Sequence, residues 1–107
     1  DPNDDHPPHS VDAGQELVAS VYEAIRANAE LWASTLLVVT YDEHGGFYDH
    51  RAPPPAVPPD DPPHAEYEFN RLGVRVPTVL ISPWITPQVV HTICDHTALL
   101  RSLSKIT

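Results

Sequence analysis

The sequence predicts an α/β fold in which helices cover a sheet, and three features of its 107 residues support this. An amphipathic stretch from residue 10 to 28 has helical spacing. Two apolar runs, at 35–40 and 76–81, are rich in β-branched residues and carry no charge, as strands buried on both faces do. Helix, short loop and buried strand form an αβ unit, and the second strand would give a parallel or mixed sheet with helices on both faces.

The first element expected is a helix that begins at Ser10 or Asp12 and ends near residue 28. Both residues are suitable N-caps. The apolar side chains of this stretch fall on one face at helical spacing, and they are Leu17, Val18, Val21, Tyr22 and Ile25. Residues 28–34 should then turn the chain, with Trp32 as an anchor against helix or sheet.

The strand expected at 35–40 ends just before a dense group of ionisable side chains. Three carboxylates and two imidazoles lie within nine residues: Asp42, Glu43, His44, Asp49 and His50. Open α/β sheets place their sites at the carboxyl ends of strands, and carboxylates are hard oxygen ligands for divalent cations. The stretch therefore predicts a metal or catalytic site.

A plainer interpretation of the same stretch is a solvated loop, because Asp, Gly and His are common loop residues. Neighbouring strand residues point to opposite faces, so Asp42 and Glu43 converge on one ion only where the backbone bends. Gly45 and Gly46 favour the functional interpretation, since they remove side chains where another group must approach the backbone. On the residues alone, both interpretations stay open.

Residues 51–66 are expected to form an extended surface loop inserted between the two strands. Seven prolines fall in this segment, and neither a helix nor an inner strand tolerates them. The loop is either a ligand for a proline-recognition partner or a substrate-side loop next to the site. Beyond it, Phe69 and Leu72 are expected to be buried, and Gly73 to need an unusual backbone angle.

The remaining polar and sulfur-bearing side chains have structural interpretations. Arg71 and Arg75 are candidates for ion pairs with the acidic loops. Cys94 lies among apolar residues and is expected to be a small buried hydrophobe and not a nucleophile. Asp95 is a suitable N-cap for a final helix, whose apolar side chains are Ala98, Leu99, Leu100 and Leu103.

Composition limits the possible partners. Fifteen acidic residues against six basic ones give a formal net charge of −9, which argues against binding to a nucleic-acid backbone, since that requires a basic patch. No apolar stretch approaches the ~18 residues that a transmembrane segment needs. A phosphate-bearing substrate remains compatible, because a bound divalent cation reverses the local field.

Four parts of the chain, in order, resemble the phosphoesterase family that holds bacterial phospholipases C, plant non-specific phospholipases C and related acid phosphatases. The first is Asn-Asp-Asp-His-Pro at 3–7, and the second is Thr-Tyr-Asp-Glu-His-Gly-Gly-Phe-Tyr-Asp-His at 40–50. The third is Leu-Gly-Val-Arg-Val-Pro at 72–77 followed by Ile-Ser-Pro-Trp at 81–84, and the fourth is Asp-His-Thr at 95–97. The resemblance covers almost the whole chain.

The resemblance implies a three-layer alkaline-phosphatase-like sheet with helices on both faces, of which residues 1–107 would be a C-terminal part. The expected partner is then the missing N-terminal half of the same catalytic domain. Localisation would follow the type of relative, secreted or periplasmic if bacterial and cytoplasmic or membrane-peripheral if plant.

The resemblance also implies roles for individual residues. Asp42 and Glu43 would ligate a divalent metal ion, together with a Glu-Asn pair and a Ser or Thr nucleophile from the N-terminal portion. His6 would be a catalytic residue that stabilises the transferring phosphoryl group. The remaining site residues would support the metal ligands or face the substrate, and they are His44, Gly45, Gly46, Asp49, His50, Asp95 and His96.

The function expected is that of a metal-dependent phosphoesterase acting on a phosphate ester or phospholipid. The 107 residues alone are expected to bind metal weakly and to turn over no phosphate ester. The alternatives are a sulfatase-like or phosphonate-type hydrolase of the same broad fold, and a non-catalytic acidic interaction module.

Overall fold

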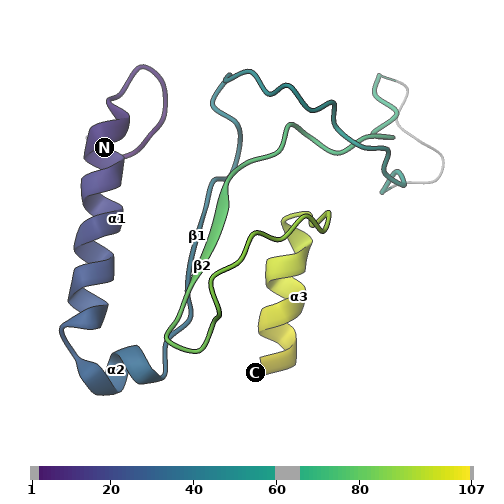
Figure 1. Cartoon of the computed structure of the whole chain (residues 1–107). Helices are drawn as coiled ribbons and strands as arrows, with labels where there is room; N and C mark the ends of the chain where they lie inside the picture. The colour runs from purple at the N-terminus through teal and green to yellow at the C-terminus, as the bar shows by residue number, and fades with distance from the viewer. Residues whose placement is uncertain (1–2, 60–65, 107) are drawn as a thin grey trace. The chain divides into compact units, whose positions relative to one another are not determined.

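The computed structural model describes residues 3–59 and 66–106 and contains two compact units. Unit 1 comprises Asp1–Phe47 and Val76–Pro87, and unit 2 comprises Tyr48–Arg75 and Gln88–Thr107. Unit 1 holds four of the elements described, and unit 2 holds one helix (Figure 1). In chain order they are α1 (Val11–Arg26), α2 (Ala29–Ala33), β1 (Leu37–Thr40), β2 (Thr78–Ile81) and α3 (Thr97–Ile106).

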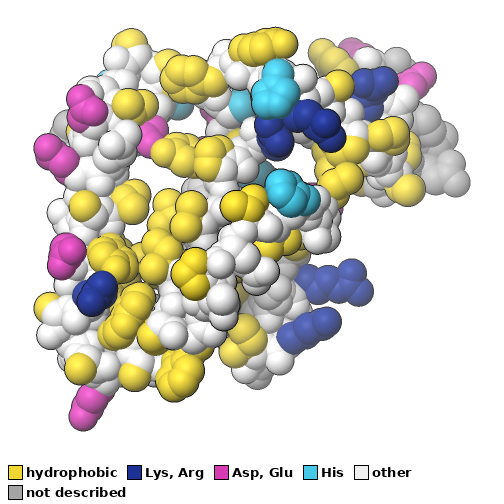
Figure 2. Space-filling view, viewed as in Figure 1, with side chains coloured by type: hydrophobic (Ala, Val, Ile, Leu, Met, Phe, Trp, Pro, Cys, Tyr) yellow, Lys and Arg dark blue, Asp and Glu magenta, His cyan; other side chains and the backbone are white. Residues whose placement is uncertain are grey.

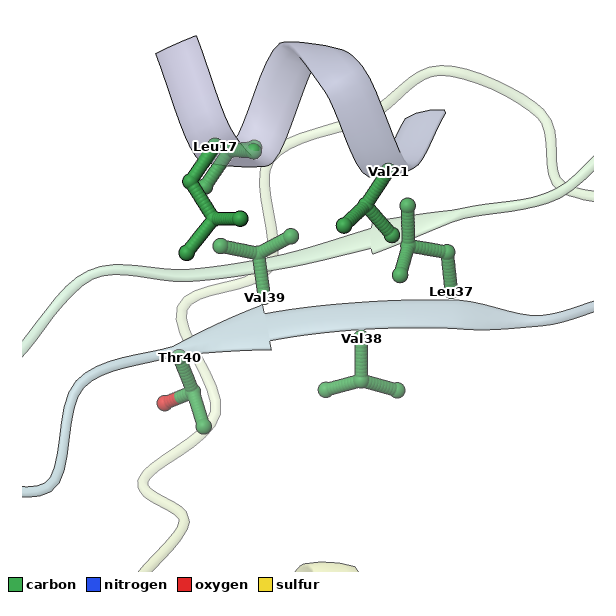
Figure 3. A pocket seen from close by; sticks show the side chains of 7 residues that line it. Leu17, Val21, Leu37, Val38, Val39 and Thr40 are labelled. Atoms are coloured by element: carbon green, nitrogen blue, oxygen red, sulfur yellow. The ribbon is translucent and has the colours of Figure 1, made fainter. Parts of the chain in front are cut away.

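Helix α1 confirms the first element predicted from the sequence. The Ser10 hydroxyl oxygen accepts a hydrogen bond from the backbone N–H of Asp12 at 3.3 Å, which is the bond an N-cap makes. The helix ends at Arg26, close to the expected residue 28. Leu17 and Val21 point from α1 toward Val39 and Leu37 of β1 (Figure 3). The predicted apolar face therefore lies against the sheet.

Helix α2 was not expected, because the sequence was interpreted as a turn between residues 28 and 34. Its start is fixed by Asn28, whose side-chain oxygen accepts from the backbone N–H groups of Glu30 and Leu31 at 3.1 and 3.0 Å. Asn is among the best N-cap residues, and two bonds from one side chain suffice to start a single turn of helix. The turn prediction is wrong for this reason.

Trp32 is confirmed as the anchor of this segment. Its ring meets the ring of Tyr22 edge-on at 5.9 Å between centroids. The Arg26 guanidinium lies 5.5 Å from the centroid of each ring. Edge-to-face aromatic pairs and cations over aromatic faces are both favourable arrangements, so α2 is held against the last turns of α1.

The two strands pair antiparallel, with Leu37 opposite Ile81 and Thr40 opposite Thr78. The α/β class is confirmed, but the expected parallel or mixed sheet is wrong for the strands that the structure describes. Parallel neighbours require a crossover connection, usually a helix, and the described residues between β1 and β2 form no helix. The chain therefore returns to β1 in the opposite direction.

The expectation that both strands are buried on two faces is also wrong. Within β1, three residues are half-buried and Thr40 is exposed. In β2, Val79 and Leu80 are 51% and 53% exposed. Helix α1 faces one side of β1 and leaves an open groove of about 240 Å³, whereas Val38 points to the other side (Figure 3). One helix cannot cover both faces of a ladder.

In unit 2, the start of the proline-rich loop is extended, as predicted, and it is held by backbone pairing. Pro55 forms an antiparallel bridge with Arg71. The N–H of Leu72 donates to the carbonyl of Pro54 at 3.0 Å, and the N–H of Ala56 donates to Asn70 at 2.8 Å. The rest of the predicted loop, residues 60–65, lies outside the described residues.

Three predictions of burial or backbone strain in unit 2 are wrong. Phe69 is 53% exposed and itself has the positive φ, 48°, that was expected at Gly73. Cys94 is exposed, and its apolar neighbours are exposed too, Val89 by 80% and Ile93 by 69%. Apolar composition predicts burial only where another element provides cover, and the described residues of unit 2 provide little.

The predicted cap of the last helix is confirmed. The Asp95 carboxylate accepts hydrogen bonds from the backbone N–H of Thr97 at 2.9 Å and from its hydroxyl at 2.5 Å. Across residues 3–59 and 66–106, no helix has the length and apolar character needed to cross a membrane.

Many large apolar side chains lie at the surface of the described chain (Figure 2). Tyr48 and Val57 are 91% exposed and Trp84 is 79% exposed. Full burial of one such side chain contributes roughly 1.5–3 kcal/mol, so this stabilisation is largely unrealised.

We therefore expect the isolated 107-residue polypeptide to unfold without a cooperative transition. Urea titration followed by circular dichroism should show a broad, gradual loss of helix. A sharp sigmoidal transition, with a slope near the roughly 1–3 kcal/mol/M typical of small domains, would contradict this.

Candidate functional site

The candidate site begins where β1 ends, in the loop from Tyr41 to Phe47. The backbone bends at Asp42 and Glu43, and the N–H of Glu43 donates to Asp42 Oδ1 at 3.0 Å. Both side chains are exposed. On a regular strand, adjacent side chains point to opposite faces, and a bend removes this restriction. The bend that convergence of Asp42 and Glu43 requires is therefore present.

A tight turn follows, closed by a hydrogen bond from the N–H of Phe47 to the carbonyl of His44 at 3.0 Å. Its two central residues, Gly45 and Gly46, have φ values of 61° and 79°. Backbone in this left-handed region strains any residue with a Cβ. Two consecutive positive φ angles are the mark of a type I′ turn, which explains the glycine pair.

Close approach, the reason expected from the sequence, explains neither glycine. A Cβ at Gly45 would lie 3.5 Å from the Phe47 ring and 3.7 Å from Pro7 Cδ, which are ordinary contact distances. At Gly46, no described atom would come within 4 Å. The contact at Gly45 shows that the turn lies beside the His6-Pro7 segment, which is distant in sequence.

That segment is held by Asp4. Its Oδ1 accepts from the backbone N–H of His6 at 2.9 Å and from Nδ1 of His9 at 2.6 Å. The hydrogen bond from His9 holds the pKa of Asp4 below its ordinary value. The N–H of His9 also donates to the carbonyl of His6 at 2.8 Å, so residues 4–9 form a closed loop.

The imidazole of His6 has a defined tautomer when it is neutral. Its Nδ1 lies 2.8 Å from the carbonyl oxygen of Pro7. A carbonyl only accepts, so Nδ1 must carry the hydrogen and Nε2 then carries the lone pair. His6 therefore presents Nε2 to any group that approaches it.

A hydrogen bond between side chains joins the two segments. The Tyr41 hydroxyl donates to Asp5 Oδ2 at 2.7 Å, and this bond is the first cause of the raised pKa of Tyr41. The other carboxylate oxygen, Asp5 Oδ1, is buried and has no hydrogen-bond partner among the described residues. Sequence reasoning missed Asp5 and Tyr41 as site residues, although both lie inside the quoted motifs. The available signal was their position, immediately before His6 and Asp42.

The predicted site residues are divided between the two units. Unit 1 brings together the His6 segment and the loop from Asp42 to Gly46, which includes His44. Unit 2 holds the other four, which are Asp49, His50, Asp95 and His96. Asp95 serves as the cap of α3, and its hydrogen bonds from Thr97 hold its pKa below the ordinary value.

Asp49 forms the ion pair expected of Arg75. Arg75 Nε lies 2.6 Å from Asp49 Oδ2, and Nη2 donates to Oδ1 at 3.1 Å. The N–H of Arg51 also donates to Asp49 Oδ1 at 3.0 Å. His50 Nδ1 is 3.6 Å from the same oxygen, beyond good hydrogen-bond distance. These contacts, led by Arg75, lower the pKa of Asp49.

The described residues do not assemble a complete metal site. Within residues 3–59 and 66–106, no three His, Cys, Asp or Glu side chains are placed to hold one ion. Asp42 and Glu43 contribute oxygen donors of the kind that Mg²⁺ and Ca²⁺ prefer. The pair therefore fits part of a coordination shell whose other ligands would come from elsewhere in the protein.

Comparison with known proteins identifies the class to which this fold and loop belong. The profile of the Phosphoesterase family matches residues 2–107. The chain belongs to the phosphoesterase family.

Individual relatives agree with the family match. The chain is 57% identical over 95 residues to non-specific phospholipase C4 of Arabidopsis thaliana, covering 83% of this chain and 18% of that protein. It is 53% identical over 119 residues to non-specific phospholipase C3 of the same plant, covering 97% and 22%. Phospholipase C B of Mycobacterium tuberculosis is 34% identical over 116 residues, covering 91% and 21%. The chain thus spans about a fifth of the length of these relatives.

The Asp49–Arg75 pair predicts a pH-dependent stability. The folded-state pKa of Asp49 lies below its ordinary value of 3.8, so the contribution is present above that value and is lost as the pH falls through the folded-state pKa. In the whole protein, Asp49→Asn should lower the Tm at pH 7, and the gap from wild type should narrow as the pH falls below 3.8. Arg75→Ala should lower the Tm with the same pH dependence. The double variant should have a Tm close to that of either single variant. A gap that stays constant with pH would contradict the assignment.

Proposed function

We propose that the protein carrying this chain is a metal-dependent phosphoesterase of the phospholipase C type, which hydrolyses phosphate esters of lipids. One observation carries the proposal. In a chain of this family, the Tyr41–Asp5 hydrogen bond and the Gly45–Pro7 contact bring the His6 segment beside the Asp42–Glu43 turn. The names of the relatives, phospholipases C from a plant and a bacterium, support the lipid substrate class.

The proposed architecture of the whole protein is a three-layer, alkaline-phosphatase-like sheet, with this chain as a C-terminal part of the catalytic domain. The exposed apolar side chains of β2 support this, since Val79 and Leu80 would then gain cover from further elements. The Ser or Thr nucleophile and a Glu-Asn pair would come from the remainder of the domain.

Hydrolysis of a phosphate ester accumulates negative charge on the non-bridging oxygens while an alkoxide leaves. A divalent cation, when bound, stabilises that charge and lowers the pKa of an oxygen that it coordinates. Asp42 and Glu43 would hold the cation. The Glu43 N–H already donates to Asp42 Oδ1, so the backbone of the next residue orients that carboxylate before any ion binds.

His6 would act on the phosphoryl group through Nε2. Its Nδ1 is engaged by the Pro7 carbonyl, so Nε2 is the atom that can hold a proton, donate it to a phosphoryl oxygen, or accept one. The bond from the His6 N–H to Asp4 and the Asp5–Tyr41 bond restrain the backbone on the N-terminal side of the ring's attachment. The imidazole would thereby be oriented before substrate binds.

Removing either proposed metal ligand should reduce metal content and activity together. For the purified whole protein, we expect Asp42→Asn and Glu43→Gln each to lower metal affinity by at least about tenfold. Elemental analysis would report metal per protein, and release of phosphocholine from phosphatidylcholine would report activity. Glu23→Gln, an equivalent neutralisation on the exposed side of α1, should leave both unchanged. Full metal content and rate in either ligand variant would refute the assignment.

Removing the His6 imidazole should separate catalysis from metal binding. We expect His6→Ala to lower kcat by about 10²–10⁴, the contribution typical of a positioned proton donor, while metal content is retained. His91→Ala provides the matched control, since His91 is exposed and is not among the predicted site residues. An unchanged kcat for His6→Ala would exclude His6 from the site.

A further inference from the structure

We propose that Asp5 and Tyr41 are a positioning pair that sets His6 relative to the Asp42–Glu43 turn, and that Gly14 provides the space this pair requires. The inference rests on the proposed function and extends it to residues that contact neither metal nor phosphate. It is argued from one hydrogen bond, one buried oxygen and one crowded glycine.

The hydrogen bond joins the residues directly before the two functional positions. Tyr41 precedes Asp42, and Asp5 precedes His6. The Tyr41 hydroxyl donates to Asp5 Oδ2 at 2.7 Å across 36 positions of sequence. Adjacent Cα atoms are only 3.8 Å apart. A shift of the Asp5 or Tyr41 backbone therefore also displaces His6 or Asp42.

The direction of this bond follows from the two groups that make it. A carboxylate offers only lone pairs, whereas a phenol carries a hydrogen, so Tyr41 donates and Asp5 accepts.

Gly14 lies in the first half of α1 and is the buried residue of that helix. A Cβ at this position would stand 1.8 Å from Asp5 Oδ1 and 2.6 Å from its Cγ. No side chain other than the hydrogen of glycine leaves room for the carboxylate. α1 thus contributes a notch in its surface that fits Asp5.

The carboxylate in this notch is not arranged for stability alone. Within the part of the chain that the structure describes, Asp5 Oδ1 is buried without a hydrogen-bond partner. Such atoms are rare because they lose their hydration without replacement. The N-terminus of α1 lies nearby and stabilises a negative charge, but this offsets only part of the cost of burying the unpaired oxygen. A group that remains in an unfavourable setting is typical of functional sites, where geometry takes precedence.

The decisive test is a double-mutant cycle between Tyr41 and His6 in the metal-loaded whole protein, assayed on phosphatidylcholine vesicles. We expect Tyr41→Phe to lower kcat about tenfold or more, as small misplacements of catalytic groups do, with metal content and Tm close to wild type. In the His6→Ala background, the same change should alter kcat less than about twofold, because its effect acts through His6.

Two further variants test the pair without relying on Tyr41. Asp5→Asn keeps an oxygen that accepts from Tyr41 and should retain most of kcat, whereas Asp5→Ala should match Tyr41→Phe. Gly14→Ala should also lower kcat, since its Cβ displaces the carboxylate. Its control is Gly73→Ala, where no described atom lies within 4 Å of the added Cβ and φ is not positive.

Tyr22→Phe is the control for loss of a tyrosine hydroxyl. It removes a hydrogen bond of the same length, 2.7 Å, made with Arg26 Nη1 away from the site. Its kcat should stay within about twofold of wild type. Equal losses in Tyr22→Phe and Tyr41→Phe would assign both to general destabilisation and overturn the inference.

The outcomes also separate this inference from the proposed function. An active wild type in which Tyr41→Phe is unchanged, or is fully additive with His6→Ala, would overturn the positioning pair and leave the phosphoesterase intact. If Tyr41→Phe and Asp5→Ala both have a lower metal content or a lower Tm than wild type, the pair has a structural role. This result would overturn the inference as well. A metal-loaded wild type without phosphoesterase activity would refute the proposed function itself, and the inference with it.

Discussion

The antiparallel pairing of β1 and β2 is the constraint on which unit 1 depends. It joins residues 37–40 to 78–81, and a hydrogen bond of 2.7 Å between the hydroxyls of Thr40 and Thr78 fastens its end. The loop with the acidic pair leaves the ladder at that end. At the other end, the indole N–H of Trp84 donates to the carbonyl of Ala33 at 2.7 Å. The ladder thus determines where the site's backbone starts.

The acidic character of the chain does not produce a group of unpartnered carboxylates at this site. Asp4 accepts from His6 and His9, Asp5 accepts from Tyr41, and Asp42 accepts from the backbone of Glu43. Each hydrogen bond disperses part of a negative charge and fixes the side chain that carries it. A net charge of −9 is therefore compatible with an anionic substrate, because the local groups and any bound cation, and not the total, determine the field.

Apart from the missed helix α2, sequence reasoning was reliable where a structural rule is local. The start of α1, the cap at Asp95 and the amphipathic face of the first helix each depend on residues a few positions apart, and all three are confirmed. It failed where the outcome depends on elements that meet through space. Strand direction and strand burial are of this kind, as is the exposure of Cys94. The positive φ at Phe69 has no side-chain signature at all.

The candidate site shows the same division. The turn at Gly45 and Gly46 follows from local chemistry, whereas the nearness of the His6 segment was expected only from resemblance to a family. The Asp5–Tyr41 bond was missed, because a contact between residues 36 positions apart leaves no periodicity to detect. The roles of Asp42 and Glu43 as ligands stay a prediction.

The two-stranded ladder also bears on the fate of the polypeptide outside its normal setting. Among the described residues, neither outer side of the ladder pairs with a third strand, so each presents a row of backbone donors and acceptors beside the apolar side chains of Val79 and Leu80. Such rows are templates for pairing with other chains. A polypeptide that displays these rows is prone to self-association, so an element that paired with them would protect the ladder from aggregation.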